Sequence, residues 1–190
     1  TDGLTEIWNR YYFEKVFNKK WIHHCRHEQP ISLIMIDIDS FMQVNDSLGH
    51  PNGDDCLQQV AQTLSKTLEQ SNGIVARYGG EEFIVILFNT ALQEAVEVST
   101  SLALKIKALG IRHPNSTISS WITANFGVAS MMPKSNTSSS ELISKADRAL
   151  YVAKKDGRDR IAYLYPPSFV IVQPSRKGQQ IQDGGPQGLR

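Results

Sequence analysis

Two apolar runs separated by a pair of glycines are the feature that most restricts how this chain can fold. The runs read GIVARY and FIVILF, and both are rich in the β-branched and aromatic residues that favour strands. The glycines between them, Gly79 and Gly80, accept the positive φ angles of a tight turn. The sequence therefore predicts a β-hairpin with strands at 74–78 and 83–88 and two glutamates directly after its turn.

Helical and strand patterns alternate along the rest of the chain. Apolar residues at spacings of three and four predict helices, and short apolar runs rich in β-branched residues predict strands. The predicted helices lie at 9–27, from Phe41 onward, at 57–68, 91–109 and 138–153, and the further strands at 31–39, 122–131 and 160–165, with a break at LGHPNG (48–53). This order predicts an α/β (α+β) fold in which helices cover a mixed central sheet.

Size, charge and cysteine content narrow the class of protein. The 190 residues suit one domain with a proper core, and a formal charge of +1 gives no overall basic field for binding nucleic acid. Two cysteines, Cys25 and Cys56, make no disulfide framework, and no apolar run reaches the roughly 20 residues of a membrane span. From Pro166 the composition shifts to Pro, Gly, Gln and Ser, so residues 164–190 are expected to be a flexible tail.

Four carboxylates fall where the fold does not require them. Asp37 interrupts the apolar run at 31–39 and would be partly buried, with no Lys or Arg nearby in sequence as a partner. Asp39 is expected to cap the short helix that follows it. Glu81 and Glu82 are either a solvated, edge-protecting hairpin tip or part of a site. Carboxylates from a strand end and a hairpin tip together make metal-assisted phosphate chemistry plausible.

Four stretches of the chain together carry a resemblance to a known family. They are DGLTEIWNR (2–10), DIDSFMQVNDSLGHPNGDDCL (37–57), RYGGEEF (77–83) and ADRALYVAKKDGRDRI (146–161). In order and spacing they resemble the GGDEF family of diguanylate cyclases, here in a GGEEF variant, over about residues 1–163. The resemblance implies a fold similar to the nucleotidyl cyclase and polymerase palm domains.

The resemblance also implies roles for particular residues. Asp37, the backbone carbonyl of Ile38 and Glu81 would bind Mg²⁺ or Mn²⁺, and Glu82 would assist the second ion or remove the proton of the attacking hydroxyl. The residues expected to bind the GTP substrate are Asn45 and Asp54 for guanine, Phe41 and His50 in the same pocket, and Lys154 and Arg158 for the β- and γ-phosphates.

Two departures from the family pattern change these expectations. Met42 stands where many members carry a Lys near the triphosphate, which weakens one phosphate contact. QSNG (Gln70–Gly73) stands where many members carry an RxxD motif for product inhibition. The primary inhibitory site is therefore expected to be absent.

The expected activity is the condensation of two GTP molecules into cyclic di-GMP with release of pyrophosphate, by a homodimer of domains. The resemblance places such a domain in the cytoplasm, as the output of a longer protein with an upstream sensory or membrane module. The rival hypotheses are a non-catalytic member that binds GTP or a protein, which Met42 favours, and a polymerase-like enzyme, which the near-neutral charge disfavours.

Other polar groups receive structural interpretations. Asp2 and Arg10 are expected to form a local ion pair. The HHCRH segment (23–27) offers two histidines one helical turn apart, but without a third ligand a solvated helix end is favoured over a zinc site. Arg77 could contact phosphate or pair with Glu82, and both alternatives stay open.

Overall fold

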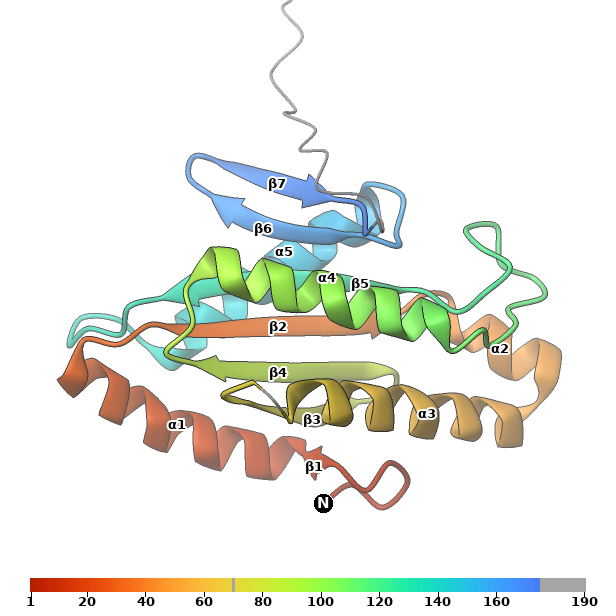
Figure 1. Ribbon diagram of the computed structural model, residues 1–190, viewed down its shortest axis with the longest axis horizontal. Helices are drawn as coiled ribbons and strands as arrows, with labels where there is room; N and C mark the ends of the chain where they lie inside the picture. The colour runs from red at the N-terminus through yellow and green to blue at the C-terminus, as the bar shows by residue number, and fades with distance from the viewer. Residues whose placement is uncertain (70, 175–190) are drawn as a thin grey trace, which may run out of the picture.

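The apolar run after Pro30 forms β2 (Ile31–Ile38), the middle strand of a mixed sheet in the computed structural model, which describes residues 1–69 and 71–174 (Figure 1). The other strands are β1 (Trp8–Asn9), β3 (Gly73–Gly79), β4 (Glu82–Phe88), β5 (Ala124–Met131), β6 (Ile161–Tyr165) and β7 (Ser168–Val172). The helices are α1 (Arg10–His27), α2 (Phe41–Leu48), α3 (His50–Leu68), α4 (Leu92–Ala108) and α5 (Ser139–Lys155).

The strand order across the sheet is β1-β3-β4-β2-β5-β6-β7. The β1–β3 and β5–β6 pairs are parallel, and the other neighbouring pairs are antiparallel. The predicted mixed sheet and its covering helices are confirmed. Because β4 lies between β3 and β2, the hairpin is inside the sheet, and the interpretation of its acids as edge protection is wrong.

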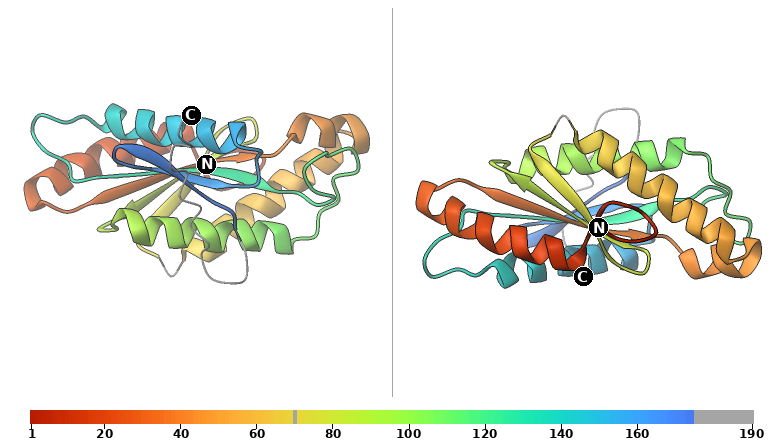
Figure 2. Two further views of the ribbon diagram at one scale, coloured as in Figure 1. Left: turned by 90° about the horizontal axis from the view of Figure 1, so that it is seen from above. Right: turned by 90° about the horizontal axis from the view of Figure 1, so that it is seen from below.

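Helices cover both faces of the sheet, which explains why β2 is apolar on both sides. Figure 2 shows α1 and α5 on one face and α3 and α4 on the other. Along β2, Ile34, Ile36 and Ile38 pack in the core with α3 and α4, whereas Leu33 and Met35 pack with α1 and α5. This alternation is the two-residue period of a strand, and it assigns the next odd position, residue 37, to the α5 face.

The predicted break at 48–53 is confined to one residue. Gly49 has a φ of 84°, which glycine adopts without strain, and α3 begins at His50 with Pro51 in its first turn. Proline at that position loses no intrahelical hydrogen bond, so a segment that reads as a loop is helical. The prediction was wrong for residues 50–53.

Two strands at the sheet edges were not predicted. β1 is two residues long and pairs with β3, while β7 pairs with β6 across a turn at Pro166 and Pro167. Residues 168–172 therefore contradict the expected flexible tail, because they form a strand whose Val172 is 4% exposed and packs in the core. The remainder of that predicted tail, residues 175–190, lies outside the described residues.

The crossing of α5 over β5 depends on Gly127. A Cβ at this position would lie 2.2 Å from the carbonyl oxygen of Ala146 and from the amide nitrogen of Leu150. No side chain fits there, so Gly127 allows helix and strand backbones to touch. The close packing places the C-terminal end of α5, and with it Lys154, beside the end of β2.

Both cysteines are free, as expected, and burial raises the pKa of the Cys56 thiol to about 12. Among residues 1–69 and 71–174, no helix has the length and apolar character needed to cross a membrane.

Candidate active site

Asp37 and Glu82 are direct neighbours across two strands. Asp37 of β2 pairs in register with Glu82 of β4 on one side and with Asn125 of β5 on the other. Like charges directly opposite each other in a sheet are destabilising. The pair therefore adds nothing to the stability of the fold. It marks the end of the sheet where the chain passes from β2 to α2 as a candidate site (Figure 1).

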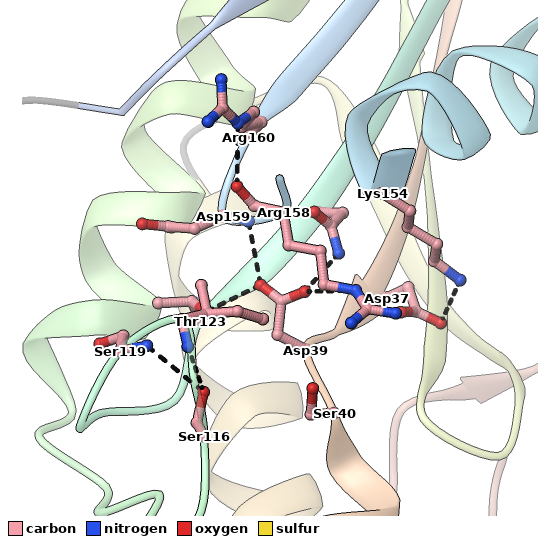
Figure 3. Close-up of polar contacts among 12 residues, drawn as sticks. Asp37, Asp39, Ser40, Ser116, Ser119, Thr123, Lys154, Arg158, Asp159 and Arg160 are labelled. Atoms are coloured by element: carbon pink, nitrogen blue, oxygen red, sulfur yellow. Dashed lines mark hydrogen bonds and ion pairs between the residues drawn. The ribbon is translucent and has the colours of Figure 1, made fainter. Parts of the chain in front are cut away.

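The carboxylate of Asp37 has a cationic partner that lies far away in sequence. Its side chain is 13% exposed, and its Oδ2 lies 2.7 Å from Nζ of Lys154 at the end of α5 (Figure 3). Burial raises the pKa of Asp37, and the charges of Glu81 and Glu82 add to this, whereas Lys154 opposes it. The expectation that Asp37 is partly buried is confirmed, and its partner comes from tertiary packing that no local pattern reveals.

The backbone of the hairpin tip is fixed from two sides. The amide of Ile38 donates to the carbonyl oxygen of Glu81 at 3.4 Å, and Nε of Arg77 donates to the carbonyl oxygen of Gly80 at 2.9 Å. Gly80 has a φ of 51°, the left-handed conformation that its place in the turn requires. The glutamate that follows the turn is thus held close to the end of β2.

Arg77 is the partner of Asp2 in the N-terminal motif. Its Nη1 lies 3.1 Å from Oδ1 of Asp2, while Arg10 pairs with Glu14 one helical turn along α1. The predicted Asp2–Arg10 pair is therefore wrong, because Arg10 faces along its own helix. Arg77 joins the N-terminal segment to the hairpin and does not pair with Glu82. A contact of Arg77 with phosphate stays a prediction.

The residues predicted to bind guanine lie on α2 and near the start of α3. Phe41 is 7% exposed, Asn45 is half-buried, and His50 and Asp54 are exposed. Gly53 allows α2 to pack closely on α3, because a Cβ at this position would lie 1.8 Å from Oδ1 of Asn45 and 3.3 Å from the ring of Phe41. The structure thus brings Phe41 and Asn45 together against α3, directly beside Asp54.

The two predicted phosphate ligands, Lys154 and Arg158, lie beside the two aspartates at the end of β2. Lys154 is the cation on Asp37, and Nε of Arg158 lies 3.8 Å from Oδ1 of Asp39, with 47% of the Arg158 side chain exposed (Figure 3). Arg158 has left the helix and has a φ of 63°. The two cations therefore reach the site from a helix end and from the turn after it.

Asp39 is not a helix cap. Ser40 occupies the N-cap position of α2 without a side-chain hydrogen bond, and Asp39 is buried with 1% of its surface exposed. It accepts hydrogen bonds from Thr123, Asn125 and the amide of Asp159. Sequence reasoning missed this role, although the two-residue spacing from Asp37 and the polar Thr123 and Asn125 within ITANFG were visible signals.

The oxygen donors present suit a hard divalent cation such as Mg²⁺ or Mn²⁺. Asp37 is partly buried beside the negative charges of Glu81 and Glu82, an arrangement that a cation relieves. Within the described ranges no three His, Cys, Asp or Glu side chains converge on a single point. Two carboxylates and the carbonyl of Ile38 nevertheless fit the donor chemistry. In α1 the rings of His23 and His27 stack on each other 4.2 Å apart, and among the described residues they have no third ligand that would make a zinc site.

The sequence matches one protein family over most of its length. The description "Diguanylate cyclase, GGDEF domain" matches residues 1–160. The chain belongs to the GGDEF domain family. The motif at 79–83 that names the family is the hairpin tip beside Asp37, here with Glu81 as its third residue.

Relatives and solved structures support this assignment of the GGDEF domain. It is 31% identical over 160 residues to the diguanylate cyclase DosC of Escherichia coli (strain K12). The matched region covers 84% of this chain and 34% of that protein. The chain thus spans about a third of the length of that relative. The coiled coil and GGDEF domain of DgcB from Caulobacter crescentus, solved in complex with c-di-GMP, superposes with a TM-score of 0.78 at 28% identity, covering 86% of this chain and 85% of that one.

A third similar structure carries the same motif variant. The active GGEEF domain of a diguanylate cyclase from Vibrio cholerae superposes with a TM-score of 0.76 at 29% identity, covering 86% of this chain and all of that one. The fold of this GGDEF domain is therefore the palm-like fold that the sequence led us to expect.

Proposed function

We propose that this GGDEF domain is a diguanylate cyclase that condenses two GTP molecules into cyclic di-GMP and releases pyrophosphate. The observation that carries the proposal is the cross-strand pair of Asp37 and Glu82, which is unfavourable for folding and lies beside Glu81, Lys154 and Arg158. Acids for a metal and cations for phosphates, gathered at one end of a sheet, are the parts that nucleotidyl transfer needs.

Guanine would bind between α2 and the start of α3. The carboxylate of Asp54 can accept hydrogen bonds from N1–H and the 2-amino group of guanine, and the amide of Asn45 can both donate and accept. Phe41 and Asn45 both lie beside Gly53, and His50 would border the guanine from the first turn of α3.

Lys154 and Arg158 would hold the β- and γ-phosphates. Both reach the site from the α5 end, and the guanidinium of Arg158 can engage a phosphate through two parallel hydrogen bonds. Met42 is 73% exposed at the start of α2 and offers no cation. Phosphate binding therefore depends on the two α5-side cations.

Asp37, the carbonyl of Ile38 and Glu81 would hold Mg²⁺ or Mn²⁺. When bound, the ion supplies positive charge against the phosphates and the developing charge of the reaction. Glu82 would accept the proton of the 3′-hydroxyl as that oxygen attacks the α-phosphorus in line and pyrophosphate leaves.

Two domains must face each other, because each one binds a single GTP and each 3′-hydroxyl attacks the α-phosphate on its partner. A two-fold homodimer satisfies this requirement. We infer that the catalytic part lies within residues 1–163 and that it acts on GTP and not on nucleic acid. It would be a cytoplasmic output domain controlled by an upstream sensory domain.

We also infer that the primary product-inhibition site is absent. Gly73 occupies the last position of the usual RxxD motif, and a Cβ there would lie 2.7 Å from the carbonyl oxygen of Ile86 and from a methyl group of Leu87. The close approach of β4 argues against an acidic side chain at this position, in addition to the missing Arg.

The test is to incubate the concentrated domain with GTP and Mg²⁺ and to quantify cyclic di-GMP by chromatography. We expect product from the wild-type chain and at least a 100-fold loss for Glu81→Gln, a substitution that removes one charge at constant size. A forcibly dimerised chain that binds GTP without making product would support the non-catalytic rival and refute the enzyme.

A further inference from the structure

The buried carboxylate of Asp39 sits at the centre of a polar cluster that the proposed chemistry does not use. Oδ2 accepts from Oγ1 of Thr123 at 2.7 Å and from the amide of Asp159 at 3.1 Å, and Oδ1 accepts from Nδ2 of Asn125 at 2.6 Å (Figure 3). These donors come from β5, its preceding loop, and the turn between α5 and β6. A carboxylate buried this deeply needs such donors, and here three separate groups supply them.

The turn that Asp39 binds has an unfavourable backbone. Gly157, Arg158 and Asp159 follow one another with φ angles of 115°, 63° and 52°. Left-handed conformations at two consecutive residues other than glycine persist only where surrounding contacts impose them. The hydrogen bond from the Asp159 amide to Asp39 is one such contact, and the ion pair between Asp159 and Lys107 of α4, at 2.6 Å, is another.

The same turn carries Arg158, whose guanidinium lies beside Asp37 and Asp39 (Figure 3). Nε of Arg158 lies 3.8 Å from Oδ1 of Asp39, which is too long for a hydrogen bond but close enough for the charges to attract. Since 47% of the Arg158 side chain is exposed, the guanidinium can still bind an incoming anion. Asp39 thus orients Arg158 and leaves its guanidinium available to bind an anion.

Asp39 is also tied to the strand that bears the metal ligands. It follows Asp37 by two residues, and its own amide donates to the carbonyl oxygen of Thr123 at 2.9 Å. One residue therefore connects the end of β2 with the α5–β6 turn, 120 positions away in sequence. A shift of the turn would therefore displace the end of β2, because Asp39 continues that strand and accepts a hydrogen bond from the turn.

We propose that Asp39 is a positioning residue for triphosphate binding, which holds the Arg158–Asp159 turn so that the guanidinium of Arg158 faces the β- and γ-phosphates beside Asp37. The proposal rests on the function proposed above, and it adds a specific role to a residue that contacts neither metal nor nucleotide.

The experiment compares two ligands on Asp39→Asn, which keeps the size of the side chain and removes its charge. The probes are 3′-deoxy-GTP, which has the triphosphate but no attacking hydroxyl, and GMP, which lacks the β- and γ-phosphates, each titrated calorimetrically with Mg²⁺. We expect 3′-deoxy-GTP affinity to fall about tenfold, as for the loss of one charge-assisted contact, and GMP affinity to change less than twofold. The matched control is Asp156→Asn, an exposed carboxylate on the same turn that pairs with Arg160, which should leave both affinities unchanged.

A double-mutant cycle separates positioning from a general effect on folding. If Asp39 acts through Arg158, Asp39→Asn costs no further 3′-deoxy-GTP affinity in an Arg158→Ala background. Additive losses, or equal losses for GMP and 3′-deoxy-GTP, would overturn the proposal. If Asp39→Asn does not fold, Thr123→Val, which removes one hydrogen bond to Asp39, decides by the same comparison.

Failure of this proposal is distinguishable from failure of the proposed function. Wild-type protein that binds 3′-deoxy-GTP and makes cyclic di-GMP, while Asp39→Asn binds both ligands normally, leaves the enzyme intact and refutes the positioning role. Wild-type protein that does not bind 3′-deoxy-GTP refutes both.

Discussion

The ammonium nitrogen of Lys154 lies 2.7 Å from a carboxylate oxygen of Asp37, so one cation neutralises the acid that is expected to bind metal. The two residues are far apart in sequence and meet because α5 packs closely on β5 at Gly127. In the proposed reaction they bind different partners, Lys154 a phosphate and Asp37 a divalent ion. Substrate and metal would therefore replace a contact that the protein makes with itself.

Lys154→Met should lower kcat/KM for GTP by about 10- to 100-fold, the range expected for one charge-assisted contact to phosphate. The substitution keeps the length of the side chain, so packing along α5 should persist. Steady-state rates of cyclic di-GMP formation at saturating Mg²⁺ measure the effect. Lys155→Met is the matched control, because Lys155 is exposed and its Nζ lies over the ring of Tyr151. Wild-type kinetics for Lys154→Met would contradict its assignment to phosphate.

Asp37→Asn should abolish activity without loss of stability at neutral pH. Burial raises the pKa of Asp37 above its ordinary value of 3.8, with Lys154 opposing the shift and the hairpin glutamates adding to it. The folded state therefore holds the proton more tightly than the unfolded state. The stability that this group contributes is complete below 3.8 and is lost as the pH rises through the higher folded pKa.

Thermal unfolding of the metal-free protein as a function of pH tests this sign. Asparagine cannot ionise, so the variant should unfold at the same or a higher temperature than the wild type at pH 7. The difference should shrink as the pH falls toward the ordinary value for aspartate. A variant that is less stable than the wild type at pH 7 would show that the Lys154 ion pair outweighs the burial of the charge.

Sequence patterns predicted the elements whose signals are local. The strand β2, the hairpin turn and the helix α5 all follow from residues close together in the chain. The extent of α3 was missed because Pro51 and Gly53 read as a loop, whereas proline is tolerated in the first turn of a helix. β7 was missed because its five residues precede a Pro- and Gly-rich segment that dominated the composition.

The site shows the same division between local and long-range information. Motif spacing located Asp37, Glu81 and Asn45, but not the partners that hold them. Lys154 on Asp37 and Asp159 on Asp39 depend on how α5 and β6 pack against β2, which spacing along the chain does not encode. Reading Asp39 as a helix cap failed for this reason, since its donors come from β5 and from the turn before β6.

Gly53→Ala should weaken GTP binding although alanine favours helices. The new methyl group would lie 1.8 Å from Oδ1 of Asn45, so the amide that is proposed to read guanine must move. We expect KM for GTP to rise several-fold, in line with the loss of one hydrogen bond to the base. Gly3→Ala is the matched control, because nothing lies within 4 Å of a Cβ at that position. Unchanged KM for Gly53→Ala would place guanine elsewhere.

Rebuilding the RxxD motif should fail to create product inhibition. The double variant Gln70→Arg, Gly73→Asp restores the residue types of the motif, but a Cβ at 73 would lie 2.7 Å from the carbonyl oxygen of Ile86 in the neighbouring strand. The β3–β4 pairing must open to admit the aspartate, which should destabilise the domain by about 1–3 kcal/mol, as overpacking generally does. Cyclic di-GMP titrated into the GTP assay gives the inhibition constant, and chemical unfolding gives the stability. Gln70→Arg alone is the control that adds the charge without the clash. Potent inhibition of the double variant at wild-type stability would contradict this prediction. It would show that β4 can accommodate a side chain at position 73, and that the inhibitory site is absent only because the chain lacks the Arg and Asp of the motif.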